Sequence, residues 1–599
     1  MALIVQKYGG TSVGSAERIK KVADRVIQTV RAGNSVVVVV SAMAKATDSL
    51  VALAQDITTE PSRREMDMLL ATGEQVTMAL LSMALQAAGQ AAISLTGGQV
   101  GIITEKEHTR ARIVAIKTGR IQRHLDQQEV VVVAGFQGIS SADDLEITTL
   151  GRGGSDTSAV ALAAALKADF CEIYTDVPGV YTTDPRLVPN AQLLTEITAD
   201  EMLELASLGA KVLHPRAVEI ARNYGVPLVV RSSWTDDPGT MVHSQNITPR
   251  SLANLELAPA VDAVEFTTNE AKIALLHVPD RPGIAGQIFR AMAREGIDVD
   301  LILQSIHDGN SNDIAFTVSQ SILSRAQAVA EALAPQLGGA EVIVEDHIAK
   351  ISITGAGMIG RPAIAAEIFE LLAAASINIQ LISTSEIKVS CAIAAKDCDR
   401  AIAILCQHFG INISAAPQGN LPTVPVRGVA LDMTQARVAV LNVPDRPGMA
   451  AKIFSLLAQR NISVDTIVQS QRTRSIKGIV TRDIAFTVAQ SEVGKGPRDA
   501  SEAQKVLEAA RAELGYGEVV LNESIAKISI VGSGMVGTPG IASRMFQALA
   551  DAGINLHIIA TSEIRVSCVV DRDQGVNALQ VVHQAFDLGG NLTVTVPGF

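Results

Sequence analysis

The residue types best suited to chemistry lie together in the stretch Gly151–Ser158, which runs Gly-Arg-Gly-Gly-Ser-Asp-Thr-Ser. Its glycines let backbone N–H groups approach a ligand closely, and they surround a guanidinium and precede a carboxylate. An alanine-rich helix is predicted from Ala159 to Lys167, and its N-terminus adds partial positive charge. The stretch therefore predicts an anion site. The alternative is a glycine turn in which Ser155, Asp156 or Thr157 only caps the helix.

A second candidate site follows the first predicted strand, where a lysine precedes a glycine loop. Its sequence is Lys7-Tyr8-Gly9-Gly10-Thr11-Ser12-Val13-Gly14-Ser15. A lysine and a glycine loop there meet the start of a predicted helix, a combination that suits the β- and γ-phosphates of a nucleotide. The lysine precedes the glycines, so this is not the Walker loop. The alternative is an ordinary strand-to-helix turn with an exposed lysine.

The elements that must position these residues alternate between short β-branched runs and helical patterns up to about Ile247. This alternation predicts a parallel α/β layer fold, in which ligands gather at the carboxyl ends of the strands. The predicted strands are Leu3–Gln6, Val36–Val40, Ala92–Leu95, Val130–Ala134, Glu172–Thr175 and Pro227–Arg231.

Length and composition restrict the class of protein. A chain of 599 residues is too long to fold around a single hydrophobic core. A composition of 48% hydrophobic and 19% charged residues is typical of globular domains. The net charge of −12 disfavours nucleic acid as the main partner. The apolar runs are shorter than the roughly 20 residues of a membrane span, and the N-terminus does not resemble a secretory signal, so we expect a cytoplasmic protein without membrane contact. Five cysteines without paired spacing indicate neither disulfides nor a metal site.

The second half of the chain is a tandem duplication of a pair of modules, in the order A, B, A′, B′. The sequence Val278–Gly283 of A recurs as Val443–Gly448 of A′, and Ile351–Gly355 of B recurs as Ile528–Gly532 of B′. Each module predicts a small βαββαβ domain. Extra polar residues in A′, around Arg472 to Thr481, predict a hairpin loop.

The motifs of the first half together resemble the aspartate kinase family. They are Lys7–Val13, Val40–Met43, Thr72–Glu74, Leu150–Asp156 and the run from Tyr174 to Arg186. The resemblance implies an amino-acid-kinase-type αβα layered domain with a mostly parallel sheet, followed by four ferredoxin-like ACT domains, which sense amino acids. Two ACT pairs in place of one resemble the cyanobacterial type. The implied domains are residues 1–250 for the kinase, 262–347, 348–417, 427–524 and 525–599 for the ACT domains, and 418–426 for a linker.

The activity that the resemblance implies is transfer of the ATP γ-phosphoryl group to the side-chain carboxylate of L-aspartate, with Mg²⁺ accompanying the nucleotide. That carboxylate is already ionised at neutral pH, so no general base is needed, and catalysis rests on positioning and charge neutralisation. Lys7 and Asp156 are the implied catalytic residues. The implied substrate residues are Ser41, Thr47, Glu74, Arg152, Gly153, Gly154 and Ser155, with Arg152 on the α-carboxylate and Glu74 on the α-ammonium. The implied nucleotide residues are Lys7, Tyr8, Gly9, Gly10, Ser12, Thr175, Asp176, Tyr181, Asp184, Arg186 and Lys211, whereas His214 is expected to pack or cap.

The resemblance also implies lysine and threonine as inhibitory effectors, bound where ACT modules pair, in a homodimer or higher homo-oligomer. An acidic loop side chain and exposed amides can hold the two ends of a free amino acid. The expected effector residues of A and A′ are Asp280, Gly283, Ile284, Ala285, Gln304, Asp445, Gly448, Met449, Ala450 and Gln469. Those of B and B′ are Asn378, Ile379, Thr384, Ser385, Asn555, Leu556, Thr561 and Ser562. Some modules could instead serve only for dimerisation.

Two other functions remain open on the sequence. One is a related kinase of the same fold that acts on glutamate or acetylglutamate. The other is a non-catalytic amino-acid sensor with an inactive kinase domain, although Lys7, Glu74, Arg152 and Asp156 are all present.

Overall fold

The computed structural model describes residues 1–141, 144–210, 212–244, 252, 254–257, 259–307, 311–358, 361, 363–411, 424–490, 499–535 and 537–590. The chain forms two compact units, which are described separately. The first contains Met1–Tyr181 and Leu193–Ala258, and the second contains Thr182–Gln192 and most of the chain from Pro259 onward. Residues 182–192, which the sequence analysis assigned to the kinase domain, therefore pack with the second half of the chain.

The first unit is built on an eight-stranded, mostly parallel sheet. All six predicted strands lie in it, which confirms the predicted α/β class. Only β11 and β12 pair antiparallel. The order of strands is β10 (Glu196–Thr198), β12 (Thr240–His243), β11 (Leu228–Ser232), β9 (Phe170–Thr175), β1 (Leu3–Tyr8), β2 (Ser35–Val40), β6 (Val130–Ala134) and β3 (Ala92–Leu95).

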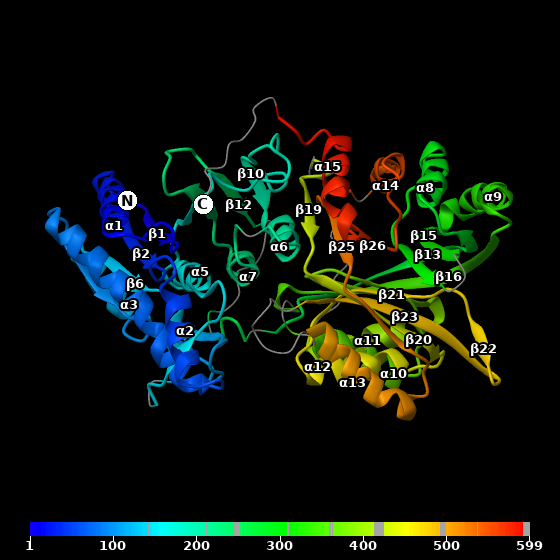
Figure 1. Cartoon of the computed structure of the whole chain (residues 1–599), viewed down its shortest axis with the longest axis horizontal. Coiled ribbons are helices and arrows are strands. Elements are labelled where there is room, and N and C mark those ends of the chain that lie inside the picture. Colours follow the sequence, from blue (N-terminus) through cyan, green and yellow to red (C-terminus); the bar gives the residue numbers. More distant parts are fainter. Residues whose placement is uncertain are drawn as a thin grey trace. The chain divides into compact units, whose positions relative to one another are not determined.

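Helices cover both faces of this sheet (Figure 1). Side chains alternate along a strand, so Val38 and Val40 of β2 pack in a core with α1 (Ala16–Arg31) and α3 (Arg63–Ala87), whereas Val39 points toward α5 (Gly154–Leu166). A smaller sheet and further helices complete the unit: β4 (Ile102–Thr104), β5 (Ile113–Ile116), β7 (Gln137–Ile139), β8 (Ile147–Thr149), α2 (Ala46–Ile57), α4 (Gly119–Asp126), α6 (Ala199–Ser207) and α7 (Pro215–Tyr224).

Helix α3 is long and apolar enough to cross a membrane by length and composition alone. It nevertheless packs on β3 and β6 and carries two buried acids, Asp67 and Glu74. Helix α3 is therefore part of the layered fold of the first unit.

The four predicted modules of the second unit are present, each with two helices on an antiparallel sheet. Module A contains β13 (Ala263–Pro279), α8 (Ile284–Arg294), β14 (Ile302–His307), β15 (Ser311–Ser319), α9 (Leu323–Leu333) and β16 (Glu341–Thr354). Module B contains α10 (Ala363–Ala374), β17 (Ile379–Thr384), β18 (Lys388–Ala394) and α11 (Cys398–Phe409). Strands β13 and β16 run through both modules, so the boundary expected at residues 347/348 falls inside β16.

Modules A′ and B′ repeat this arrangement. Module A′ contains β20 (Gln435–Pro444), α12 (Met449–Gln459), β21 (Val464–Gln469), β22 (Arg474–Ile476), β23 (Ile479–Ala489), α13 (Asp499–Leu514) and β24 (Val519–Asn522). Module B′ contains β19 (Gly428–Asp432), β25 (Ile525–Val531), α14 (Ile541–Asp551), β26 (Ile558–Ser562), β27 (Arg565–Asp571) and α15 (Gly575–Ala585). The predicted hairpin of A′ is confirmed, because β22 pairs with β23. Most of the expected linker at 418–426 lies outside the described residues.

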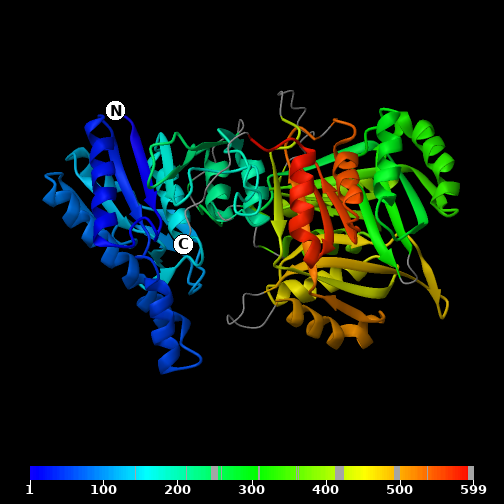
Figure 2. The same cartoon turned by 45° about the horizontal axis from the view of Figure 1, so that its top comes forward.

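The modules pair across the duplication, A with B′ and A′ with B. Strands β14 and β26 pair edge to edge, and α8 packs on α14 with Phe289 and Phe546 in ring contact at 5.5 Å. Helices α10 and α12 pack in the same way, with Phe369 and Phe454 at 5.5 Å. The result is a ten-stranded sheet from A, B and B′ facing the sheet of A′ (Figure 2).

Candidate functional site

Lys7 and Asp156 form an ion pair at the carboxyl end of the parallel sheet. Lys7 is next to the last residue of β1, and its Nζ lies 2.6 Å from Oδ1 of Asp156 in the first turn of α5. Each side chain is 12% exposed, so the pair is mostly shielded yet open to a ligand. A Cβ on Gly9 would stand 3.4 Å from Lys7 Nζ, and the glycine thus leaves the ammonium uncovered.

Helix α5 begins at Gly154, five residues earlier than predicted, and it has no side-chain cap. Its N-cap is Gly153, in the left-handed region with φ of 69°. The Thr157 hydroxyl donates backward to the Gly153 carbonyl at 3.2 Å and does not cap the first N–H groups. The alternative of a purely capping role for Ser155, Asp156 or Thr157 is therefore wrong. The helix presents N–H groups and a positive dipole end beside the ion pair.

His214 and Arg216 pack against the glycine loop and hold it in place. A Cβ on Gly153 would lie 2.2 Å from the His214 ring, so only glycine fits there. His214 caps α7, as expected, by accepting from the Arg216 N–H at 3.3 Å, and burial lowers its pKa, as does Arg216. The Arg216 guanidinium donates to the carbonyls of Leu150 and Ala111 and pairs with Glu256 at 2.9 Å. Nothing in the sequence marked Arg216 for this role.

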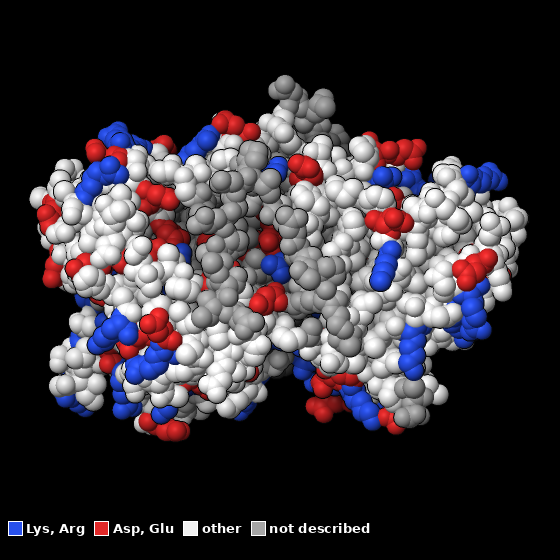
Figure 3. Space-filling view, turned by 180° about the vertical axis from the view of Figure 1, so that it is seen from behind, with Lys and Arg blue, Asp and Glu red and all other residues white. Residues whose placement is uncertain are grey.

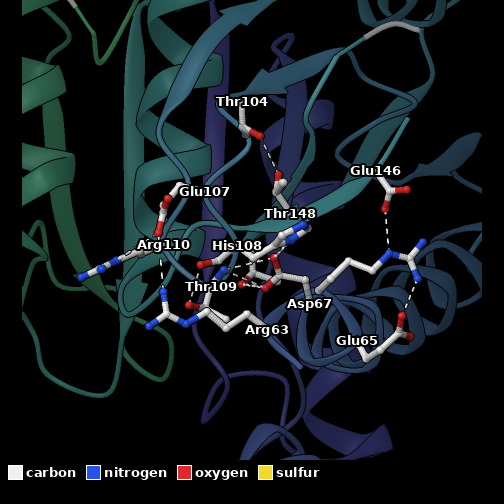
Figure 4. Close-up of polar contacts among 12 residues, drawn as sticks. Arg63, Glu65, Asp67, Thr104, Glu107, His108, Thr109, Arg110, Glu146 and Thr148 are labelled. Atoms are coloured by element: carbon white, nitrogen blue, oxygen red, sulfur yellow. Dashed lines mark hydrogen bonds and ion pairs between the residues drawn. The ribbon is translucent and has the colours of Figure 1, made fainter. Parts of the chain in front are cut away.

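Asp67 of α3 is a second buried support that the sequence analysis missed (Figure 4). It is fully buried and accepts from the Thr109 N–H at 3.1 Å and from the Thr149 hydroxyl at 2.5 Å. His108 Nδ1 lies 2.7 Å from its other oxygen. Thr149 comes two residues before Gly151, so Asp67 joins α3 to the base of the glycine loop.

Glu74 of α3 is buried with one oxygen bonded and the other open. Gly73 lets the helix approach β2, since a Cβ there would stand 2.9 Å from the Ala42 Cβ. Glu74 Oε1 accepts from the Ala42 N–H at 3.0 Å, whereas Oε2 has no hydrogen-bond partner among the described residues. Burial raises the Glu74 pKa to about 7, against the opposing effect of the Ala42 hydrogen bond. An open, desolvated carboxylate oxygen suits a cationic ligand group.

Two of the predicted nucleotide residues have buried side chains. Tyr8 is fully buried and stacks on Tyr174 with ring centroids 4.7 Å apart, and burial raises its pKa well above the usual value. Ser12 is also fully buried, with its hydroxyl 2.5 Å from that of Ser233. Only the backbone of these two residues is available to a ligand in this arrangement. A Cβ on Gly10 would lie 2.8 Å from the Ala42 carbonyl oxygen. The glycine therefore allows this loop to lie close to the end of β2.

The remaining predicted residues of the first unit differ in exposure. Ser41, Thr47, Thr175 and Tyr181 are half-buried, Arg152 and Asp176 are exposed, and Ser155 is buried. Lys211 lies outside the described residues.

Asp184 and Arg186 belong to the segment that packs in the second unit. The Arg186 guanidinium donates to both carboxylate oxygens of Asp184, at 2.9 and 2.6 Å. The segment is held there by Thr182, whose hydroxyl lies 2.9 Å from His583 Nε2 and whose carbonyl accepts from the Val429 N–H at 2.8 Å. Nothing in the sequence pattern predicted that this segment would pack in the second unit.

Each crossed module pair forms a small cavity beside a Pro-Gly loop. The cavity of A with B′ includes the predicted residues Gly283, Ile284, Ala285, Gln304, Asn555 and Leu556. The cavity of A′ with B includes Asn378, Ile379, Asp445, Gly448, Met449, Ala450 and Gln469. Both loops lead into a helix whose N-cap glycine, Gly283 or Gly448, has φ near 95° and no side-chain cap.

The acid of each loop has a different partner. Asp280 accepts from the side-chain amides of Asn312 at 3.0 Å and Asn555 at 2.8 Å. Asp445 instead pairs with the Arg482 guanidinium at 2.9 Å. The acid of the A′ loop is thus paired with a cation, whereas the acid of the A loop is held by two side-chain amides.

The other predicted effector residues lie elsewhere in the modules. The Thr561 hydroxyl accepts from the Ile302 N–H at 2.7 Å and donates to the Asp300 carbonyl at 3.1 Å. The Thr384 hydroxyl donates to the Asp465 carbonyl. These threonines, with the neighbouring Ser385 and Ser562, stand at strand ends that join the paired modules and line neither loop cavity.

Charged groups outside these sites are of both signs. On the face drawn in Figure 3, Lys and Arg are interspersed with Asp and Glu over the described surface, so that no field of a single sign extends across it. Within the described part of the chain, no three His, Cys, Asp or Glu side chains are grouped so as to hold a metal ion.

Family models match segments in both halves of the chain. The amino acid kinase family model matches residues 2–232. ACT domain models match residues 272–335 and 437–495, and a second ACT model matches residues 351–409 and 528–586.

Individual relatives are similar over long stretches. The aspartokinase of Geobacillus stearothermophilus is 51% identical over 416 residues, which are 69% of this chain and 99% of the relative. The aspartokinase of Mycolicibacterium smegmatis is 48% identical over 415 residues, 69% of this chain and 97% of the relative. A crystal structure of aspartate kinase from Synechocystis is 60% identical, covers 100% of both chains and superposes with a TM-score of 0.86.

Proposed function

The chain belongs to the aspartate kinase family, and we propose that it binds ATP and L-aspartate around the Lys7–Asp156 pair. The family's enzymes transfer the γ-phosphoryl group of ATP to the side-chain carboxylate of L-aspartate, and ACT domains regulate this one. The observation that carries the placement is the ion pair of Lys7 with Asp156, beside the glycine loop of β1 and the uncapped start of α5.

Lys7 is the residue that neutralises the transferring phosphoryl group. The aspartate carboxylate is ionised at neutral pH and attacks without a base, so the rate depends on position and on the stabilisation of charge. Asp156 holds the Lys7 ammonium, while N–H groups of Gly10 and the first turn of α5 bind phosphate oxygens. Mg²⁺ bound with the nucleotide would reduce the charge of its phosphates.

Glu74 and Arg152 select an amino acid as the phosphoryl acceptor. The open Glu74 Oε2 pairs with the α-ammonium of aspartate, and the exposed Arg152 guanidinium forms a two-point contact with the α-carboxylate. Ser41, Thr47 and Ser155 are the neutral donors around them.

Acceptor specificity tests this assignment. Release of ADP is measured with L-aspartate, L-glutamate and N-acetylglutamate for the wild type and Glu74→Gln, with the exposed Glu17→Gln as control. We expect aspartate as the preferred acceptor and a KM for aspartate at least tenfold higher in Glu74→Gln, because a charge-assisted contact of about 1.5–3 kcal/mol is lost. Preference for another acceptor would contradict the function, and an unchanged KM would contradict the role of Glu74.

The two loop cavities are the proposed sites for lysine and threonine. The effector carboxylate binds the uncapped helix start after Gly283 or Gly448, and the side-chain amides of Asn555 or Asn378 bind its polar groups. Asp445 is neutralised by Arg482, whereas Asp280 has only side-chain amides as partners among the described residues. The more cationic effector, lysine, therefore belongs at the A–B′ cavity.

Calorimetric titration of each effector tests this placement. Asp280→Asn is expected to weaken lysine binding at least tenfold with little effect on threonine, and Asp445→Asn to weaken threonine. The exposed Asp573→Asn serves as control. Equal loss of both effectors in one variant would contradict the assignment.

We further propose a cytoplasmic homodimer or higher homo-oligomer held by ACT modules. Sedimentation of the full chain would measure its oligomeric state.

A further inference from the structure

A third cavity lies between the ten-stranded sheet and the sheet of A′, on the opposite face of β20 and β23 from the loop cavity. It has about 120 Å³ open to the centres of water molecules, compared with about 30 and 10 Å³ in the two loop cavities. Successive residues of a strand point to opposite faces of the sheet. Asp483 and Ala485 therefore line this cavity, whereas Arg482 and Ile484 line the loop cavity of A′ with B. None of the functions above uses this space.

The cavity is floored by two small residues. Ala439 of β20 and Ala485 of β23 are direct cross-strand partners, so their methyl groups leave the space above them open. Apolar walls surround this floor, formed by Leu441, Val468, Val520 and Ile558.

Arg437 lies at one end of the cavity without a counter-ion. Its guanidinium makes no hydrogen bond or ion pair within the described residues, and its Nε is buried without a partner. Burial lowers the Arg437 pKa, and Asp571, which opposes that effect, is itself engaged by His557 at 2.8 Å. An arginine removed from water without an anion is unfavourable unless a ligand supplies the charge.

The first copy of the module provides an internal comparison. Lys272 is the equivalent residue in A, since 437 − 272 = 165 is the offset of the repeat. Lys272 stands opposite Glu345 and pairs with it at 2.5 Å, whereas Arg437 stands opposite Asn522. The duplication has kept the cation and replaced its acidic partner with an amide.

Two further polar residues, Ser305 and Asp483, line the cavity. Ser305 of β14 is only 7% exposed, and its hydroxyl is buried without a hydrogen-bond partner among the described residues. Asp483 lies toward the other end of the same sheet face, where it accepts from the Asn442 N–H at 2.7 Å and lies 3.8 Å from the Arg474 guanidinium.

We propose that this cavity binds a small aliphatic carboxylate. The carboxylate pairs with Arg437 and accepts from Ser305, and the aliphatic body lies over Ala439 and Ala485 against the apolar walls. An α-amino acid with an aliphatic side chain could add a contact from its ammonium to Asp483. This site is independent of the loop cavities and of the phosphoryl transfer proposed above.

Calorimetry of the full chain with three probes tests the proposal: L-leucine, its deaminated analogue 4-methylpentanoate, and inorganic phosphate. We expect at least one of the two carboxylates to bind, with affinity at least tenfold weaker in Arg437→Met and in Ala439→Leu, which fills the floor but keeps the charge. Arg281→Met and Arg446→Met, which alter the loop cavities, should bind the carboxylates as the wild type does. Leucine tighter than 4-methylpentanoate would identify the ligand as an amino acid, and equal affinity a simple carboxylate.

Three results would overturn the proposal. They are no heat from either carboxylate, binding that survives both Arg437→Met and Ala439→Leu, and binding of phosphate alone. Thermal unfolding of Arg437→Met controls for folding, because removal of an unpaired cation should leave the midpoint equal or higher.

Discussion

Glu74 is an acid whose charge state should control recognition of the substrate. Its pKa of about 7 in the free protein, raised by burial, means that it is neutral below pH 7 and charged above. Only the charged form pairs with an ammonium, so the KM for aspartate should rise as the pH falls from 8 to 6. In Glu74→Gln this dependence should be absent. Steady-state kinetics at several pH values measure it, and an identical pH profile in the variant would exclude Glu74 as the ammonium partner.

Glu270 of β13 should make stability depend on pH. Burial first, and then the neighbouring Asp300, raise its pKa from 4.5 to about 7. The folded state therefore holds a proton that the unfolded state releases near pH 4.5, so the contribution of Glu270 to stability is present at low pH and is lost as the pH rises through about 7. Thermal unfolding of wild type and Glu270→Gln compares this directly. We expect the midpoint of the variant, relative to wild type, to rise between pH 5 and 7.5, and a constant difference would contradict the assignment.

The candidate site residues were easier to predict from the sequence than the buried residues that hold their loops in place. Lys7 and Asp156 stood out because they lie in glycine loops, whereas Glu74 was predicted only from the resemblance of its motif to the family. Asp67 and Arg216 did not, because their role comes from contacts with Thr149 and Leu150 that only the folded chain creates.

At the scale of elements, the start of α5 depends on Gly153. An alanine at this position would be strained by the φ of 69°, and its Cβ would clash with the His214 ring at 2.2 Å. Gly225 is a matched control, since its φ of 68° is alike but nothing lies within 4 Å of its Cβ position. We expect Gly153→Ala to lose at least tenfold in kcat/KM, whereas Gly225→Ala loses about 1 kcal/mol of stability with normal kinetics. Equal kinetics in both variants would contradict a role for the loop shape.

The strands of the first unit were predictable because β-branched runs such as Val36–Val40 have few other favourable conformations. The start of α5 was not, because Gly154, Ser155 and Asp156 are poor helix formers that join the helix only once Gly153 has turned the chain.

At the scale of the whole molecule, residues 182–192 link the chemistry to regulation through the chain itself. The segment packs with the ACT modules, while the residues on both sides belong to the first unit. The Thr182 hydroxyl lies 2.9 Å from His583 Nε2, donates to the Leu588 carbonyl at 3.1 Å and accepts from the Gln192 N–H at 3.0 Å. Loss of these contacts in Thr182→Val, each worth about 1 kcal/mol, should weaken inhibition by the proposed effectors lysine and threonine severalfold and leave activity without effectors within about twofold. Thr183→Val, buried without such a contact, is the control. Inhibition curves equal to wild type in Thr182→Val would contradict this link.

The crossed pairing of modules could not be predicted from sequence. Copies A and A′ carry the same Val-Pro-Asp-Arg-Pro-Gly loop, so local pattern cannot choose which copy meets Asn378 and which meets Asn555. The choice comes from long-range contacts such as the edge pairing of β14 with β26.

The most direct test of the account is formation of the acyl phosphate from ATP and L-aspartate, trapped as its hydroxamate, in Lys7→Met and in the exposed control Lys20→Met. If Lys7 neutralises the transferring phosphoryl group, its variant should lose about 10²–10³ in kcat while the control keeps wild-type activity. Full phosphoryl transfer by Lys7→Met would contradict the account.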